Sequence, residues 1–392
     1  MAENRKHIMP VYAPPPVAFE RGEGVRLFTA EGESYLDFVA GIAVTALGHS
    51  HPALVKTLQE QAGKLWHTSN MFRVPAGEEL AAKMCRDTFA DRVFFTNSGT
   101  EAIECAIKAA RKFHWANGAP ERIDMVTFQG AFHGRSLGAI NAGGNPKYLE
   151  GFGPALPGFV QVPFGDHDAL DAAVGETTTA VFVEPVQGEG GVRAIPESCL
   201  TELRKLCDER GALLIYDEVQ CGMGRTGKLF AHEWAENAAP DIMCVAKGVG
   251  GGFPFGACLM SEAVGAPMQP GSHGSTYGGN PLAMAVGNTV WDIISDEAFL
   301  ENVRRVAGTL TQGLKSLADS HPDQVVGVTG KGLLCGLQMK DAPKPLQGAL
   351  RDKNLLVGVA GNNVLRLAPP LIITDEDVRE AVSTIDAALS AQ

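Results

Sequence analysis

Two residues of opposite charge, Asp217 and Lys247, each stand at the end of an apolar, strand-like run: LLIYDE at 213–218 and DIMCVAKG at 241–248. A lysine can form a Schiff base with an aldehyde cofactor, and a carboxylate can pair with the protonated ring nitrogen of that cofactor. The glycines that follow Lys247 leave room for close backbone approach. The pair predicts pyridoxal phosphate chemistry. Taken singly, a lysine after a strand is usually a solvated surface residue, and an acid there can hold magnesium in nucleotide hydrolases.

A second candidate site lies between the apolar run RVFFTN and a helical stretch, where Ser98, Gly99 and Thr100 form a small-residue turn. Ser98 and Glu101 fit a capping box, in which the two side chains satisfy free backbone N–H groups at a helix start. Capping alone would explain them. A helix N-terminus also attracts anions through its free N–H groups and dipole. Together with Asp217 and Lys247, the turn predicts a phosphate-binding site.

The segment GMGRTG at 222–227 matches the dinucleotide-binding pattern G-x-G-x-x-G, and with Lys228 it comes close to a nucleoside triphosphate loop. Leu229 stands where the magnesium-binding hydroxyl of such a loop should be. No acid ends a second strand ~20 residues on, as dinucleotide binding requires, and the next strand carries Lys247 instead. Both interpretations are therefore disfavoured.

The composition is that of an ordinary globular enzyme: 392 residues, 45% hydrophobic and 20% charged. A net charge of −12 argues against nucleic acid or an anionic membrane as the main partner. No apolar run reaches the ~20 residues of a membrane span, and MAENRKHIMPVY lacks the apolar core of a signal peptide. Eight cysteines without metal-ligand spacing indicate reduced thiols and no metal site. We expect a cytoplasmic enzyme.

The chain is long for a single core, so we expect two domains. From about residue 76, helix-like stretches (76–90, 101–116 and 197–210) alternate with short apolar runs, which predicts an α/β fold with a mostly parallel sheet between helices. We expect an N-terminal segment at 1–50 that contains a hairpin, a large domain at 51–283 and a smaller α+β domain at 284–392. Ligands on such sheets bind beyond the carboxyl ends of the strands, where Asp217, Lys247 and Ser98 all fall.

The chain resembles the class III aminotransferases of the ornithine and acetylornithine type, which have the type I pyridoxal-phosphate-dependent transferase fold. The resemblance covers nearly the whole chain, and its motifs occur in the family's order. They are YLDFVAGIAV, LGHSHP, NSGTEA at 97–102, FHGRS at 132–136, EPVQGEGG at 184–191, YDEVQCGMGRTG at 216–227, AKGVGGGFPFGA at 246–257, GSHGSTYGGNPLA at 271–283 and LRLAPPL at 365–371.

This resemblance implies roles around the cofactor ring. Lys247 would be the Schiff-base lysine and later the acid and base that moves the proton between substrate carbon and cofactor. Asp217 would keep the pyridine nitrogen protonated, since an opposed carboxylate typically raises such a pKa by ~1–3 units. Gln220 would contact the ring hydroxyl, and Phe132 would stack on the ring.

The resemblance also implies a shared phosphate site. Ser98, Gly99 and Thr100 would bind the phosphate from one subunit. Thr276, in the loop STYGG, would reach the phosphate of the neighbouring subunit. The active protein would therefore be a homodimer with shared active sites.

Two arginines are implied in substrate binding, because bidentate pairing with a carboxylate gives both charge and orientation. Arg135 and Arg366 would hold the two carboxylates of glutamate or 2-oxoglutarate. Glu189 would neutralise Arg366 when the amino donor has no carboxylate at that end. Tyr12 aligns with a tyrosine that some members use near the α-group of the substrate.

Within the family, the motifs are most similar to those of enzymes of arginine biosynthesis that transfer the δ-amino group of N-acetylornithine to 2-oxoglutarate, giving N-acetylglutamate 5-semialdehyde and glutamate. Ile42 stands where ornithine aminotransferases carry a tyrosine, and a small apolar residue leaves room for an acylated α-nitrogen. N-succinylornithine, ornithine and 4-aminobutyrate remain alternative donors, and succinyl-diaminopimelate is an alternative second substrate. A glutamate-semialdehyde aminomutase or a non-catalytic cofactor-binding protein has less support, because the Arg366 clamp and the catalytic positions are all present.

Overall fold

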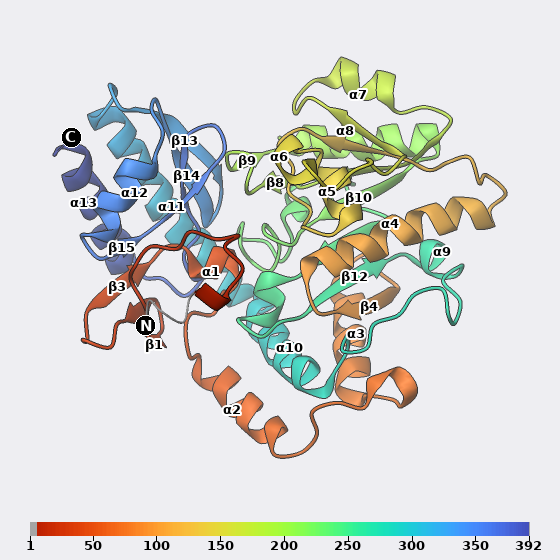
Figure 1. Cartoon of the computed structure of the whole chain (residues 1–392), viewed down its shortest axis with the longest axis horizontal. Coiled ribbons are helices and arrows are strands. Elements are labelled where there is room, and N and C mark those ends of the chain that lie inside the picture. The colour runs from red at the N-terminus through yellow and green to blue at the C-terminus, as the bar shows by residue number, and fades with distance from the viewer. Residues whose placement is uncertain (1–5, 392) are drawn as a thin grey trace.

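The computed structural model describes residues 6–391, and a seven-stranded sheet lies at its centre (Figure 1). The strand order is β4-β12-β11-β10-β7-β5-β6. Only β12 runs against its neighbours, so the expected mostly parallel sheet is confirmed. The strands are β4 (Arg92–Thr96), β5 (Asp124–Phe128), β6 (Phe159–Val162), β7 (Thr178–Val183), β10 (Leu213–Asp217), β11 (Ile242–Val245) and β12 (Gly256–Met260).

Helices cover both faces of this sheet, and the alternation of side chains in β10 shows why. Leu213 and Ile215 pack in the core beneath α4 (Gly99–Ala116), whereas Leu214 and Tyr216 pack in the core beneath α8 (Glu197–Arg210). Successive side chains of a strand point to opposite faces, so an all-apolar strand needs a cover on each side.

The helices predicted at 76–90, 101–116 and 197–210 are confirmed as α3 (Pro75–Asp87), α4 and α8, with ends that differ by a few residues. The remaining helices are α1 (Ala40–Ala43), α2 (Pro52–Ala62), α5 (Leu137–Gly143), α6 (Pro146–Leu149), α7 (His167–Ala173), α9 (Glu262–Gly265), α10 (Pro281–Ile294), α11 (Glu297–Ser320), α12 (Lys344–Arg351) and α13 (Asp375–Leu389), with 3-10 turns η2 (Ser69–Met71), η3 (Ala231–Trp234) and η4 (Lys247–Gly250).

The C-terminal part of the chain forms an antiparallel sheet of β13 (Val325–Lys331), β14 (Leu334–Met339), β16 (Gly358–Ala360) and β17 (Val364–Leu367). Helix α11 packs on this sheet, and α13 packs on α11. The N-terminal strands β2 (Arg26–Phe28) and β3 (Ser34–Asp37) form the predicted hairpin. Strand β1 (Arg21–Glu23) extends it beside β2, and β3 pairs with β15 (Leu355–Leu356). A two-stranded ribbon, β8 (Val186–Gln187) and β9 (Arg193–Ala194), completes the strands. The N-terminal segment thus lies beside the C-terminal part (Figure 1). Domain boundaries at residues 50 and 283 stay a prediction.

All eight cysteines are free, and only Cys85 and Cys199 are not buried. Residues 222–227 form a run of turns that is not followed by an α-helix. A dinucleotide-binding loop and a nucleoside triphosphate loop both need a helix N-terminus at that point, so the structure agrees with neither. Within residues 6–391, no helix has the length and apolar character that crossing a bilayer demands.

Arg225, in the turns after β10, joins the central sheet to the C-terminal part. It is 2% exposed, and its Nη1 donates to the carbonyl oxygens of Leu333, at 3.3 Å, and Pro369. Leu333 precedes β14 and Pro369 follows β17. Burial without a carboxylate lowers the pKa of Arg225 to about 10. The hydrogen bonds to these two carbonyls are therefore the main interactions that offset the desolvation cost of burying the guanidinium.

Arg225→Ala should lower the free energy of unfolding by roughly 2–4 kcal/mol, because it removes charge-assisted hydrogen bonds and leaves a cavity. Denaturant titration measures this. Arg379→Ala, at an exposed position of α13, is the matched control and should change the value by less than about 0.5 kcal/mol. Equal stability of the two variants would contradict the joining role of Arg225.

Candidate active site

A cavity of about 450 Å³ opens where the central strands end. It brings together side chains from loops after β4, β5, β10 and β11, as expected for ligand sites on such sheets. Eight of the residues selected from the sequence line it: Ser98, Gly99, Thr100, Phe132, Arg135, Asp217, Gln220 and Lys247.

Asp217 and Lys247 meet because β10 pairs with β11 in parallel, with Asp217 opposite Cys244. Lys247 begins the 3-10 turn η4 at a φ of +49°, a left-handed conformation that L residues rarely adopt. Burial is the main cause that lowers its pKa, and Arg366 acts in the same direction, against the nearby carboxylates. A lowered pKa keeps more of the amine neutral and nucleophilic.

His133 is a site residue that the sequence analysis missed. Its Nδ1 lies 2.8 Å from Asp217 Oδ2, and its ring stacks on Phe182 at 4.3 Å between centroids and 12° between planes. Burial opposes its protonation, but the hydrogen bond and charge of Asp217 outweigh burial, so the pKa of His133 is raised. The other oxygen of Asp217 accepts from Val219 N at 3.0 Å. The carboxylate is therefore fixed in orientation. Its place in the chain could have indicated this role, because His133 follows β5 at the same sheet edge where β10 ends.

The turn before α4 has half of the capping box that the sequence predicted, because the Glu101 side chain accepts from Asn97 N and not from the N–H of the N-cap residue Ser98. Ser98 is the N-cap, and its Oγ accepts from Glu101 N at 3.4 Å, while Glu101 Oε2 accepts from Asn97 N at 2.8 Å. Thr100 Oγ1 lies 2.9 Å from Ser136 Oγ. A Cβ on Gly99 would lie 2.9 Å from Val219 Cγ1, so this position cannot carry a side chain without a shift. The first turn of α4 therefore lies directly against the loop after Asp217.

Arg366 reaches the site from β17, where it pairs with Gly336. It is 6% exposed, and its Nη1 donates to Glu189, to Gly188 O at 3.3 Å and to Gln220 Oε1 at 3.1 Å. Glu189 thus neutralises Arg366 in this structure. Gln220 connects the arginine to the loop that follows Asp217.

Arg135 is exposed and stacks on an aromatic side chain, with its Cζ 3.6 Å from the centroid of the Tyr148 ring. The ring of Phe132 lies at 5.6 Å from the same Cζ. Stacking orients a guanidinium while its N–H groups remain available to a carboxylate.

Four of the selected residues do not line the cavity. Arg366 contacts it through Gln220 and pairs with Glu189, whereas the other two lie away from it. Thr276 and Tyr12 are both exposed, and Tyr12 is 80% so. The loop that holds Thr276 is tied to the phosphate turn, because Asn97 Nδ2 donates to Ser275 Oγ at 3.1 Å. Neither residue is brought to the site by this chain alone.

Comparison with known proteins agrees with this arrangement. The family model described as aminotransferase class III matches residues 8–389. The chain belongs to this family. It is similar to acetylornithine aminotransferase 2 of Caulobacter vibrioides, with 57% identity over 99% of the chain and 96% of that protein, and to acetylornithine aminotransferase of Agrobacterium fabrum, with 54% identity over 100% and 98%.

Solved structures of ornithine and N-acetylornithine aminotransferases share the fold. The ornithine aminotransferase of Toxoplasma gondii superposes with a TM-score of 0.95 at 32% identity, over 100% of this chain and 94% of that one. The N-acetylornithine aminotransferase of Stenotrophomonas maltophilia gives 0.86 at 36% identity, over 100% and 99%. The predicted α/β fold of the type I pyridoxal-phosphate-dependent transferases is confirmed.

Glu184 is a buried carboxyl in the wall of the cavity, 4% exposed. Its Oε2 accepts from Phe132 N at 3.1 Å and its Oε1 from Gly188 N at 3.4 Å. Burial first, and then the charge of Asp217, raise the pKa of Glu184 to about 7. At neutral pH this carboxyl is therefore partly protonated.

Glu184→Gln should change how stability depends on pH. Because the folded-state pKa of about 7 lies above the ordinary 4.5, the protonated carboxyl stabilises the fold below pH 4.5, and this contribution is lost as pH rises through about 7. Between these values the free energy of unfolding of the native enzyme should fall with pH more steeply than that of Glu184→Gln. Denaturant titration across the range measures both slopes, with exposed Glu209→Gln as control. Parallel slopes for all three would contradict the assignment.

Proposed function

We propose that this class III aminotransferase transfers the δ-amino group of N-acetylornithine to 2-oxoglutarate, giving N-acetylglutamate 5-semialdehyde and glutamate. The observation behind the reaction is the cavity that brings together Lys247, Asp217 and an arginine clamp. The donor is supported by curated relatives at 51–57% identity over nearly the whole chain, all named acetylornithine aminotransferase.

The cofactor is pyridoxal phosphate, which class III aminotransferases use. The residues present fit it: a helix N-terminus at Ser98–Thr100 for the phosphate, a buried carboxylate at Asp217 for a cationic ring nitrogen, and Phe132 beside them. Once bound, the cofactor supplies an electron sink for the substrate carbon. Gln220 is proposed to contact the ring hydroxyl.

The protein's own residues supply the positioning and the protons. Lys247, with its lowered pKa, is the neutral amine that holds the cofactor and takes and returns a proton at its Nζ. Asp217 keeps a negative charge beside the ring nitrogen. His133 holds that carboxylate in place and supports its charge.

Two arginines are proposed to recognise the substrates in turn. Arg135 binds the carboxylate of either substrate, with its guanidinium oriented by Tyr148. The ion pair of Arg366 with Glu189 suits a donor that has no carboxylate at its reacting end. When glutamate enters, its second carboxylate replaces Glu189 on Arg366.

Ile42 is the residue that bears on the acyl group of the donor. Ile42 is 47% exposed with a φ of +68°, so a bulkier side chain is not excluded by packing. N-succinylornithine, ornithine and 4-aminobutyrate are the competing donors. A relative from Yersinia pestis at 43% identity is named acetylornithine/succinyldiaminopimelate aminotransferase, which supports succinyl-diaminopimelate as a further substrate. An aminomutase would not need the Arg366 clamp.

We also propose a cytoplasmic homodimer in which Thr276 and Tyr12 complete the site. Both residues are exposed, and the hydrogen bond from Asn97 to Ser275 fixes the loop that carries Thr276. These observations support contact of this loop with a partner subunit. A partner's phosphate would then be contacted by Thr276.

Arg135→Ala should lower kcat/KM for N-acetylornithine and for 2-oxoglutarate by about 30-fold, because it removes hydrogen bonds to a charged substrate group, which contribute roughly 1.5–3 kcal/mol. Arg366→Ala should lower kcat/KM for 2-oxoglutarate far more than for N-acetylornithine. Arg379→Ala is the surface control. An unchanged kcat/KM for both substrates in Arg135→Ala would remove Arg135 from the site.

The reaction itself is tested by measuring glutamate formed from N-acetylornithine and 2-oxoglutarate. Activity should disappear when 2-oxoglutarate is left out and in Lys247→Ala. Persistent turnover of glutamate semialdehyde without 2-oxoglutarate would support the aminomutase instead.

A further inference from the structure

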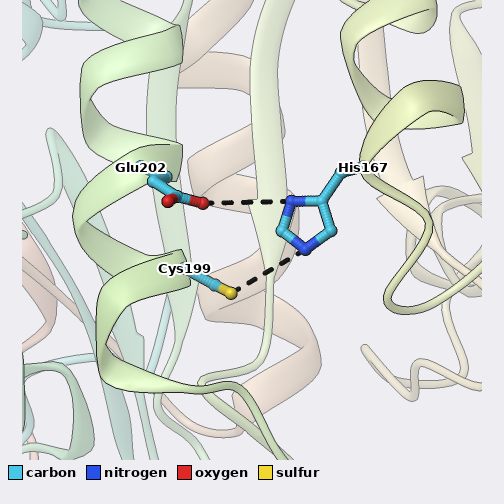
Figure 2. A group of neighbouring side chains, drawn as sticks. All are labelled: His167, Cys199 and Glu202. Carbon is cyan, nitrogen blue, oxygen red and sulfur yellow. Dashed lines mark hydrogen bonds and ion pairs between the residues drawn. The ribbon is translucent and has the colours of Figure 1, made fainter.

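Outside the active site, three potential metal ligands lie side by side: His167, Cys199 and Glu202 (Figure 2). All three line a second cavity of about 440 Å³. His167 is the first residue of α7, while Cys199 and Glu202 are three positions apart and so share one face of α8. His167 Nε2 lies 3.8 Å from Cys199 Sγ, and His167 Nδ1 lies 3.9 Å from Glu202 Oε2. None of the three lines the active-site cavity.

We propose that these three side chains bind a soft divalent cation of the Zn²⁺ class. Thiolate, imidazole and carboxylate are the donors that zinc takes, at about 2.0–2.3 Å each, with water free to complete a tetrahedron. Such bond lengths place neighbouring ligand atoms roughly 3.5 Å apart. One atom from each residue already lies within 4.8 Å of the others, so closing onto an ion needs shifts of about an ångström.

One adjustment is required, because the thiol and the carboxylate face opposite ring nitrogens (Figure 2). A single ion binds one nitrogen of an imidazole, so the ring or the carboxylate must turn. Both have room to do so, since the His167 and Glu202 side chains are 61% and 65% exposed. Cys199, which is less exposed, supplies the fixed point on α8.

The charge around the cavity favours a cation. Asp166 and Asp171 also line it, and Arg210 neutralises only Asp171, at 2.7 Å. Binding replaces the thiol S–H bond with a Zn–S bond and releases the proton to solvent, with no change in oxidation state. A bound ion would link α7 to α8, which cover the sheet beside β6 and β10.

The test is a Zn²⁺ titration of the holoenzyme in competition with a chromophoric chelator. We expect one equivalent bound, and at least tenfold weaker binding in Cys199→Ser and in His167→Ala. Cys85→Ser, which removes the other thiol that is not buried, should bind as the native protein does. X-ray absorption should show one sulfur at about 2.3 Å from zinc. All variants should keep native aminotransferase activity without zinc, because none of these residues touches the active site.

Alkylation by iodoacetamide separates this proposal from its main alternative. Zn²⁺ should slow the labelling of Cys199 and leave that of Cys85 unchanged. Fast labelling of Cys199 that zinc does not slow would mean that His167 acts as a base toward the thiol instead, which overturns the proposal. Equal zinc affinity in Cys199→Ser and the native protein, or a zinc shell without sulfur, would overturn it as well.

Discussion

The parallel pairing of β10 with β11 is the constraint on which the active site depends. It sets Asp217 opposite Cys244, three residues before Lys247, so the acid and the amine emerge at the same sheet edge. Both strands are apolar and buried on two faces, which fixes their register, because a slip of one residue would turn their side chains to the wrong sides. The packing of the core therefore determines how far apart the carboxylate of Asp217 and the amine of Lys247 lie.

The site also depends on the pairing of buried groups of opposite charge. Asp217 is held by His133 and Arg366 by Glu189, and these opposed groups shift the pKa of buried Lys247 in opposite directions. The pairing of Asp217 and of Arg366 offsets the cost of removing their charges from water. Glu189 can be displaced from Arg366 by a substrate carboxylate, and the arginine then stays paired. A site that must accept two substrates in turn gains specificity from this exchange.

Residues next to strand ends and helix starts could be predicted from the sequence, because local patterns mark those places. Ser98 with Glu101 carries its own capping signature, and Asp217 and Lys247 end visible apolar runs. His133 could not be assigned in this way, since its role depends on β5 and β10 lying on either side of β7. The bond from Arg366 to Gln220 joins residues far apart in sequence through the pairing of β14 with β17, which no local pattern encodes. The family resemblance supplied Arg366, but not its contact with Gln220.

The most direct measurement is a half-reaction titration of the native enzyme, with the visible absorbance of its bound cofactor followed by stopped flow. N-acetylornithine, N-succinylornithine, ornithine and 4-aminobutyrate are each added without 2-oxoglutarate. We expect rapid loss of the band with N-acetylornithine, slow loss with ornithine and 4-aminobutyrate, and no visible band in Lys247→Ala. Faster reaction with 4-aminobutyrate or ornithine would contradict the proposed donor. A native protein with no visible band would contradict the role of Lys247 itself.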